Sequence, residues 1–483
     1  MIEAFDCFHT QAYIGGQWLD AMDRSTFDVL NPANDNVIAA VANCGSKETE
    51  QAISAAHGAL ALWSATPAKE RARLMRAWFE IITANAETLA TLLTIEQGKP
   101  FKEAKAEITY GASYIEWFGE EAKRIYGDVI PAPGADKRIF TIKQPVGVVG
   151  CITPWNFPNA MLARKIAPAI ASGCTTVCKP ANETPLSALA LAHYANVVGI
   201  PDGVINILCG KTAEIGETLT GSNKVRKLTF TGSTAVGKKL TADCAATMKR
   251  TSMELGGNAP FIIFGDADIP AAVNGLMASK FRNSGQTCVC ANRILVQANI
   301  YDDFAKALQI ATEKLVVGDG MDPQTTIGPL IHSKAAHDTQ TRLNQALEDG
   351  AKIYWPAAIE DYEGSNFVQP VILTDVKEQM SICAEEIFAP IAPLVRFSDE
   401  ADAIRLANNT QAGLAAYVYT NDTGQIIRVA ESLEYGMVGI NEGIISNEMA
   451  PFGGVKESGN GREGSKYGLD DYLEIKYVCL GGL

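Results

Sequence analysis

Residues 146–178, VGVVGCITPWNFPNAMLARKIAPAIASGCTTVC, contain the pattern that decides the fold. A short apolar run at 146–152 is followed by an amphipathic segment at 157–172 and a second apolar run at 175–178. Short apolar runs rich in β-branched residues predict buried strands, and the segment between them predicts a helix. Strand, helix and strand in this order form the unit that builds parallel sheets.

The same alternation continues toward the C-terminus. Apolar runs at 204–208 and 227–231 alternate with helical segments at 186–199, 213–221 and 235–248. This order predicts an α/β fold whose parallel sheet is doubly wound, with helices on both faces.

A second α/β region is expected from about 260 to 455, with strand candidates at 260–264, 294–297 and 415–419. Residues 472–477 alternate apolar and polar side chains, which predicts an edge strand. Such a strand either completes a sheet of its own chain or pairs with another subunit, and the pattern favours neither.

Residues 68–97 are predicted to form one helix upstream of these strands. Leu74, Trp78 and Ile82 recur at helical spacing, and Gly98 with the following Pro100 ends the segment.

Composition narrows the function classes. Among 483 residues, 41 Lys and Arg face 55 Asp and Glu, which gives a net charge of −14 and argues against a nucleic-acid partner. A site for an anion must therefore be built from specific Arg or Lys residues.

No apolar run is long enough to span a membrane, and the first residues do not resemble a signal peptide. The 11 scattered cysteines show no metal-ligand spacing, so we expect no metal, a reducing compartment and a cytoplasmic protein.

Two segments at the ends of predicted strands, one with glycines and one with a lysine, lie where α/β proteins bind ligands. In FTGSTAVG, residues 230–237, Gly232 and Ser233 stand before a helix whose N-terminus could bind a phosphate, although such a pair more often only caps the helix. In KPANETP, residues 179–185, Lys179 is either a ligand or a solvated loop lysine.

Three further motifs contain groups that could carry out chemistry. In FRNSGQTCVC, Cys288 follows Gly285 among polar residues, which suits an exposed thiol on a tight turn better than a core cysteine. In MELGGNAP, Glu254 is either a general base or a cap. In PWNFP, the Asn156 amide either donates into an oxyanion site or serves its own turn.

In this order and spacing, the motifs resemble those of the aldehyde dehydrogenase superfamily. The resemblance runs from about residue 12 to the end and includes EQGK at 96–99, EEIFAP at 385–390 and PFGGVKESGNGRE at 451–463. It implies that Cys288 attacks the aldehyde carbonyl to form a thiohemiacetal, that Asn156 and the Cys288 N–H hold the oxyanion, and that hydride transfer leaves a thioester. Glu254 would then activate the hydrolytic water, and Lys165 would support the site.

The resemblance also implies an NAD(P) cofactor, with NADP slightly favoured. Asn182 replaces the Glu that NAD-preferring members often carry, so a 2′-phosphate is not repelled and Lys179 could pair with it, although Glu183 lies next to it. Where the family usually has Gly, this chain has Ala389, which we expect to be tolerated. The implied cofactor-binding residues are Trp155, Lys179, Asn182, Gly232, Ser233, Glu386 and Phe388.

Within the superfamily, MLARK at 161–165, KFRNSGQTCVCANR at 280–293 and the tail from Gly443 most resemble succinate-semialdehyde dehydrogenases. In those enzymes two arginines and a serine hold the distal carboxylate, and the matching positions are Arg164, Arg282 and Ser446. Each Arg could instead form a structural ion pair, and for Arg164 taken alone this alternative is favoured. Glutarate semialdehyde, one methylene longer, and a broader aldehyde range remain alternatives.

Cys290, two residues after Cys288, is either a passive thiol or the partner in a reversible redox switch. A non-catalytic lens-type relative is disfavoured because Cys288, Glu254 and Asn156 occur together. A CoA-acylating relative is disfavoured because those enzymes tend to lack the base.

The resemblance implies a homodimer or homotetramer that acts in GABA degradation, without nucleic acid or membrane partners. We predict a dinucleotide-binding domain at 1–124 and 145–255, a catalytic domain at 256–455, and a β oligomerisation arm at 125–144 and 456–483.

Overall fold

The first sheet is the doubly wound sheet that the sequence predicts. The computed structural model describes residues 2–358 and 365–483. Its parallel strands lie in the order β11-β10-β7-β8-β9, so the chain runs outward from β7 in one direction and then returns to add β10 and β11 on the other side. The strands are β7 (Val148–Ile152), β8 (Thr175–Lys179), β9 (Ile205–Ile207), β10 (Val225–Thr231) and β11 (Arg250–Glu254).

Helices cover both faces of this sheet because side chains alternate along its strands. On β7, Val149 and Cys151 enter one apolar core and Val148 and Ile152 enter the other. Every predicted strand and helix of this region is confirmed, with ends shifted by a few residues. The connecting helices are α5 (Pro158–Ser172), α6 (Pro185–Val197), α7 (Thr212–Gly221) and α8 (Thr234–Ala245).

Antiparallel strands extend both edges of the sheet. These are β1 (Ala12–Ile14) and β2 (Gln17–Leu19) beside β9, and β19 (Gly459–Asn460) beside β11. A separate ribbon consists of β3 (Thr26–Leu30) and β4 (Val37–Ala42), and a short 3₁₀ turn, η1 (Ile2–Ala4), precedes them.

The prediction of one helix at 68–97 is wrong, because two helices occupy this segment. Asn85 leaves helical geometry at φ −105° and ψ 19°, and its side-chain amide donates to the Ile81 carbonyl at 2.8 Å. Such a side chain competes with the helix for backbone groups. The segment ends at Gly98 as predicted, in the left-handed conformation. The helices between β4 and β5 in the chain are α1 (Ser46–Ala65), α2 (Ala68–Ala84), α3 (Ala86–Gln97), α4 (Phe101–Glu121) and η2 (Ala122–Arg124).

The second sheet has the order β14-β15-β16-β13-β12-β17-β18, parallel except for β14, and the predicted strands 260–264, 294–297 and 415–419 are confirmed within it. Its strands are β12 (Ala259–Ile263), β13 (Ala291–Gln297), β14 (Lys352–Trp355), β15 (Val371–Val376), β16 (Ile391–Phe397), β17 (Ala415–Tyr419) and β18 (Met437–Ile440). Its helices are α9 (Ile269–Lys280), η3 (Arg282–Gly285), α10 (Tyr301–Thr312), α11 (Ser333–Glu348), α12 (Ser381–Ala384), α13 (Glu400–Asn408) and α14 (Thr423–Ser432).

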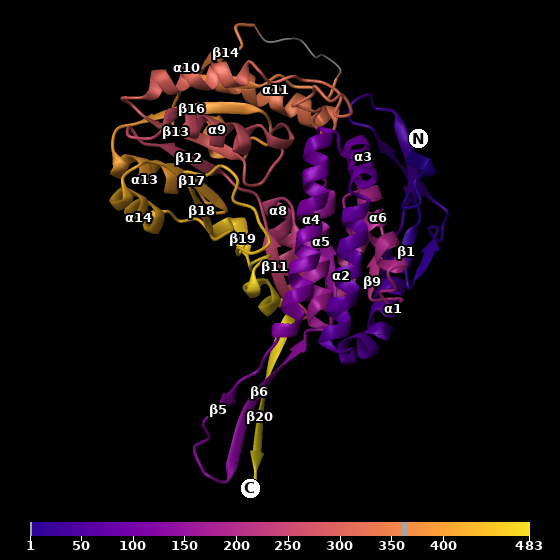
Figure 1. Ribbon diagram of the computed structural model, residues 1–483. Coiled ribbons are helices and arrows are strands. Elements are labelled where there is room, and N and C mark those ends of the chain that lie inside the picture. The colour runs from indigo at the N-terminus through magenta and orange to yellow at the C-terminus, as the bar shows by residue number, and fades with distance from the viewer. Residues whose placement is uncertain (1, 359–364) are drawn as a thin grey trace.

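A β arm projects from the body and carries the C-terminus near its tip (Figure 1). It contains β5 (Val129–Ile130), β6 (Lys137–Pro145) and β20 (Leu473–Gly481), with β6 in the middle. The predicted terminal strand therefore pairs within its own chain. The preceding segment, with η4 (Lys456–Ser458), β19 and η5 (Lys466–Tyr472), does not join this sheet, because β19 pairs with β11. No helix in the described ranges is long and apolar enough to cross a membrane.

Candidate active site

A cavity of about 240 Å³ lies where the strand order of the first sheet reverses, between β7 and β10. This is the position at which open α/β sheets bind ligands. The first sheet contributes the ends of β7, β10 and β11, and the second sheet contributes the segments that lead into β13 and β16. The lining residues are Pro154, Trp155, Asn156, Met161, Thr231, Gly232, Ser233, Glu254, Leu255, Gly256, Cys288, Glu386 and Phe388.

The loop that carries Cys288 has a strained backbone. Asn283, Ser284 and Gly285 follow one another with φ values of 50°, 57° and 79°. A Cβ on Gly285 would lie 2.4 Å from the Ala389 carbonyl oxygen, so the loop packs directly against the segment before β16. Such conformations cost about 1–3 kcal/mol each at non-glycine positions and persist where the surroundings impose them. The sequence predicted the tight turn from Gly285 alone.

Cys288 differs from the buried cysteines of the chain because its side chain is partly exposed to the cavity. It packs against Phe157, Ala160 and Met161, a small apolar cluster at the start of α5. Burial raises the pKa of the thiol to about 12, opposed by the positive charge of Arg164. The free thiol is therefore protonated at neutral pH, and attack on a carbonyl requires removal of its proton.

Cys290, in contrast, is buried, and its thiol contacts the backbone carbonyls of Lys280 and Ala291 at 3.4 and 3.5 Å. All eleven cysteines are free thiols within the described residues. The redox role of Cys290 remains a prediction.

Glu254, at the end of β11, is a buried carboxyl group without partners. Neither of its oxygens accepts a hydrogen bond from any described residue. Burial, and then the charge of Glu463, raise its pKa well above the ordinary value. A carboxyl group of this kind accepts a proton readily once it is ionised, which is the property of a general base.

Asn156 is held at the entrance to α5 by several hydrogen bonds. Its backbone carbonyl oxygen accepts hydrogen bonds from Lys99 Nζ at 2.7 Å and from Asn283 Nδ2 at 3.0 Å. Its own Nδ2 donates to the Gln286 carbonyl at 3.0 Å, which leaves one amide proton free. The Cys288 N–H has no acceptor among the described residues. Two donors are thus available beside the thiol, as an oxyanion site requires.

Arg164 and Lys165, successive residues of α5, both form buried ion pairs with Glu463. Glu463 lies beside Arg164 Nε, and its Oε1 is 2.5 Å from Lys165 Nζ. Arg164 also lies over the Phe452 ring at 4.3 Å. Burial raises the pKa of Glu463, but the two cations hold this pKa below its ordinary value. The structural ion pair considered for Arg164 is therefore present, while Arg164 Nη2 is buried without an acceptor among the described residues.

Arg282 has no such partner. It forms no salt bridge within the described residues, and its Nε is buried without a hydrogen bond. Its guanidinium lies 5.3 Å from the centre of the Phe157 ring, and its charge lowers the pKa of Cys288, although less than burial raises it. Ser446 is partly exposed, in the segment after β18. Whether these side chains bind a substrate remains a prediction.

On the cofactor side, Ser233 begins α8, but its side chain does not cap the helix. The N–H groups of the first turn are therefore available to a phosphate next to Gly232. Trp155 and Phe388 meet edge to face, with ring centres 5.6 Å apart. Burial raises the pKa of Glu386 to about 8, and its Oε1 accepts from the Gly257 N–H at 3.4 Å.

Lys179 and Asn182 do not line the cavity. They follow β8, next to β7, and Lys179 Nζ donates to the Pro180 carbonyl at 3.0 Å and to Asn182 Oδ1 at 3.3 Å. Lys179 is buried, and no salt bridge to it occurs within the described ranges. Burial lowers the pKa of this lysine. A buried cation of this kind is suited to an anionic ligand group.

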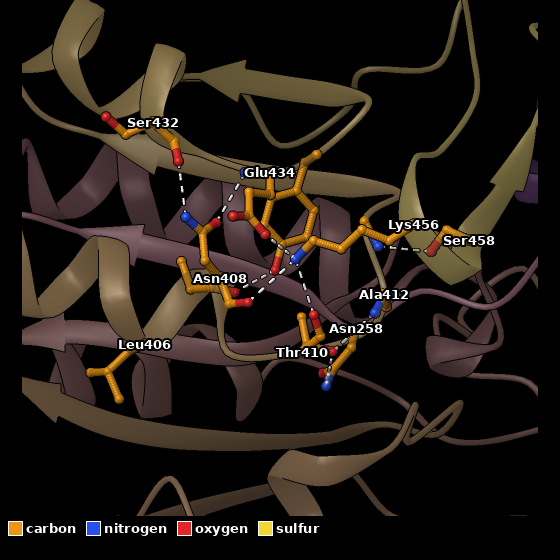
Figure 2. A network of polar contacts seen from close by, with 12 residues as sticks. Asn258, Leu406, Asn408, Thr410, Ala412, Ser432, Glu434, Lys456 and Ser458 are labelled. Carbon is orange, nitrogen blue, oxygen red and sulfur yellow. Dashed lines mark hydrogen bonds and ion pairs between the residues drawn. The ribbon is translucent and has the colours of Figure 1, made fainter.

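The segment 451–463 holds Glu254 and its neighbours in place. Ser458 Oγ donates to the Gly256 carbonyl at 2.7 Å and accepts from the Gly413 N–H at 2.9 Å. Figure 2 shows the adjoining network, in which Lys456 reaches the carbonyls of Asn408 and Thr410 at 3.3 and 3.0 Å. Lys456 also pairs with Glu434 at 2.5 Å. The PFGGVKESGNGRE motif therefore connects the two sheets beside Glu254.

Several residues around the site were not singled out from the sequence. Glu463 and Lys99 occur within matched motifs, but nothing in the sequence shows that they form buried ion pairs. Glu107, the partner of Lys99, lies on a helix whose acidic residues look alike. Phe157 and Met161 follow the Asn156 motif closely, and this proximity was the available signal.

The comparisons with known proteins agree with this geometry. Residues 18–478 match the model of the aldehyde dehydrogenase family. The chain belongs to the aldehyde dehydrogenase family. It is 56% identical to the succinate-semialdehyde dehydrogenase [NADP(+)] GabD of Escherichia coli K12 and 55% identical to a glutarate-semialdehyde dehydrogenase of Pseudomonas putida, and each match covers 98% of both chains.

A crystal structure of an E. coli NADP-dependent enzyme superposes with a TM-score of 0.97 at 55% identity, over 99% of both chains. The aldehyde dehydrogenase fold and oxidoreductase class expected from the sequence are confirmed. The described residues contain no cluster of His, Cys, Asp or Glu that could hold a metal ion.

Proposed function

We propose that this aldehyde dehydrogenase oxidises succinate semialdehyde to succinate, with Cys288 as nucleophile and with NADP or NAD as hydride acceptor. The observation that supports this substrate is Arg282, a cation without an ion-pair partner in the described residues. Its Nε is buried without a hydrogen bond, and its guanidinium lies 5.3 Å from the centre of the Phe157 ring, which packs with Cys288. A substrate carboxylate would supply a hydrogen-bond acceptor for this guanidinium. The glutarate semialdehyde named for one relative is one methylene longer and remains the second candidate.

In the proposed reaction, the Cys288 thiol gives its proton to solvent, and Sγ bonds to the aldehyde carbon while the carbonyl π electrons move to the oxygen. The free amide proton of Asn156 and the Cys288 N–H stabilise the negative oxygen, and loss of one such donor costs about 10²–10³ in rate. Hydride would leave the former aldehyde carbon for a bound NADP or NAD, and that carbon would become the thioester of Cys288. Glu254 then takes a proton from water, which attacks the Cys288 thioester and releases the free acid.

The residues around the cavity fit a dinucleotide. The open N-terminus of α8 at Gly232 and Ser233 would hold the pyrophosphate, and Glu386 would hold the nicotinamide ribose between Trp155 and Phe388. The buried cation of Lys179 would pair with a 2′-phosphate, and the neutral Asn182 would not repel it. NADP is therefore proposed as the favoured cofactor, as the name of the E. coli relative states for that enzyme.

The arm supports a proposal of a homo-oligomer. Val129 on β5 is 87% exposed, and Ile475, Tyr477 and Leu480 on β20 are 69%, 62% and 50% exposed. Exposed apolar residues on a projecting sheet favour burial against another subunit. The division into the three predicted domains, and the choice between dimer and tetramer, also remain predictions.

The deciding experiment is steady-state oxidation of succinate semialdehyde, glutarate semialdehyde and butyraldehyde, each with NADP and NAD. We expect kcat/KM for succinate semialdehyde to exceed that for butyraldehyde by at least about 100-fold, the size of one to two charged hydrogen bonds. Equal efficiency with butyraldehyde would refute the carboxylate site. Asn182→Glu should move the cofactor preference toward NAD, and a strong preference of the wild type for NAD would contradict the cofactor proposal.

A further inference from the structure

A fully buried ion pair lies behind Asn156. Lys99 directly follows Gly98, which ends α3, and Glu107 lies on α4. Lys99 Nζ is 2.6 Å from Glu107 Oε2, and neither side chain has any exposed surface. Taking two charges out of water is costly unless every polar atom finds a partner. The contacts of this pair therefore indicate what it holds in place.

Lys99 contacts the oxyanion motif directly. Its Nζ donates to the Asn156 carbonyl oxygen at 2.7 Å and lies 3.8 Å from the centre of the Phe157 ring. Glu107 holds the next turn, because its Oε1 accepts from the N–H groups of Asn159 and Ala160 at 3.0 and 3.2 Å. The ion pair thus fixes the chain both at Asn156 and at the start of α5.

The cysteine loop is attached to the same point. Asn283 Nδ2 donates to the Asn156 carbonyl at 3.0 Å and to the Gln286 carbonyl at 3.2 Å, and Asn156 Nδ2 donates to that same Gln286 carbonyl. The Asn156 carbonyl therefore receives one donor from the ion pair and one from the loop of Cys288. We therefore expect a change in Lys99 to shift Asn156 relative to the thiol.

We propose that Lys99, held by Glu107, is a positioning residue for the oxidation: it sets the orientation in which the Asn156 amide meets the oxyanion, without touching the substrate. This inference rests on the proposed role of Asn156. A purely structural pair would stabilise the packing of α3 and α4 and would affect all activities through stability alone.

The test uses Lys99→Met/Glu107→Gln in the full-length chain, since removing both charges avoids an uncompensated buried ion. Lys105→Met on α4, which removes the exposed ion-pair partner of Glu87 on α3, is the matched control. We expect kcat to fall about 10- to 100-fold, as misplacement of a catalytic group by an ångström can cause. The control should keep the wild-type kcat, and alkylation of Cys288 by iodoacetamide without cofactor should keep its rate in both variants.

A double-mutant cycle with Asn156→Ala separates the two roles. If Lys99 acts through Asn156, the pair substitution causes no further loss of kcat in the Asn156→Ala background. The same fold-loss in both backgrounds, a wild-type kcat, or slowed alkylation would overturn the proposal for Lys99. If Asn156→Ala alone keeps the wild-type kcat, the oxyanion role of Asn156 itself is wrong, and the inference about Lys99 fails with it.

Discussion

The cavity and the layer of residues directly behind it both contain buried carboxyl groups, but in opposite environments. In the cavity, Glu254 has two oxygens without partners, and its pKa is raised. Behind it, Glu463 lies between the cations Arg164 and Lys165, and its pKa is lowered. Burial is common to both, so the partners decide the charge state of each group.

This difference separates residues suited to reaction from residues suited to support. An unpartnered buried polar group costs about 1–3 kcal/mol and is retained where function needs it. A buried carboxylate that is paired with cations is held in its ionised form, and the pair fixes the geometry around it. The comparison predicts that a substitution at Glu254 changes the rate, and that a substitution at Glu463 changes stability first.

The largest effect is expected for Cys288→Ala. Without the nucleophile, kcat should fall by at least about 10⁴-fold, as for other enzymes that form a covalent intermediate. The free energy of unfolding should change little because the partly exposed thiol has no strong partner. Cys290→Ala is the matched thiol control and should keep most of the activity. Substantial turnover by Cys288→Ala would place the nucleophile elsewhere.

The comparison is tested most directly by Glu254→Gln and Glu463→Gln. Glu254→Gln should lower kcat by about 10²–10⁴-fold, with a burst of reduced cofactor because the thioester accumulates. It should also raise the melting temperature, since a neutral amide replaces a carboxyl group that is costly to ionise.

Glu463→Gln should instead destabilise the fold by about 3–5 kcal/mol, because Arg164 and Lys165 lose their counter-charge. Urea unfolding of both variants measures the change in the free energy of unfolding, which should be positive for Glu254→Gln and negative for Glu463→Gln. If both substitutions destabilise the protein equally, the contrast between the two carboxyl groups does not hold.

A smaller effect is expected from Arg282→Gln. Loss of a charged hydrogen bond of about 1.5–3 kcal/mol should lower kcat/KM for succinate semialdehyde by about 10- to 150-fold. The value for butyraldehyde should stay close to that of the wild type. An equal loss with both aldehydes would make Arg282 a structural residue.

The smallest effect is the pH dependence of stability. The pKa of Glu254 is higher in the folded than in the unfolded chain, so folding binds a proton above the ordinary value of 4.5. The stability that this group contributes is therefore lost as pH rises. The advantage of Glu254→Gln over the wild type should grow with pH, by at most about 1.4 kcal/mol per pH unit. Over the same range, kcat of the wild type should increase as Glu254 ionises. If the difference in stability between Glu254→Gln and the wild type becomes smaller as pH rises, the raised pKa of Glu254 is contradicted.

The regular half of this site was predictable from the sequence. Strand β11, which ends at Glu254, is not predicted from the sequence. Asn156 and Gly232 follow strands β7 and β10, and apolar runs mark the ends of those two strands. Because carboxyl ends of parallel strands share one edge, their proximity followed from the fold.

The other half depended on irregular backbone. Asn283, Ser284 and Phe388 all have positive φ values, which no local pattern announces for such residues. The pairing of Arg164 and Lys165 with Glu463 was also unpredictable, because no periodicity connects residues so far apart. The break at Asn85 was missed because apolar spacing continues through it, although Asn is a residue that competes for backbone hydrogen bonds.

The ion pairs of Glu463 also have a consequence for synthesis of the chain. Glu463 follows Lys165 by 298 residues, and translation proceeds from the N-terminus. The two cations of α5 therefore leave the ribosome long before their counter-charge, so the first sheet cannot reach its final state during elongation. A product that stops short of residue 463 would contain Cys288, Glu254 and Asn156 and still lack a properly assembled active site. For this protein, assembly of the candidate active site depends on one of the last segments to be translated.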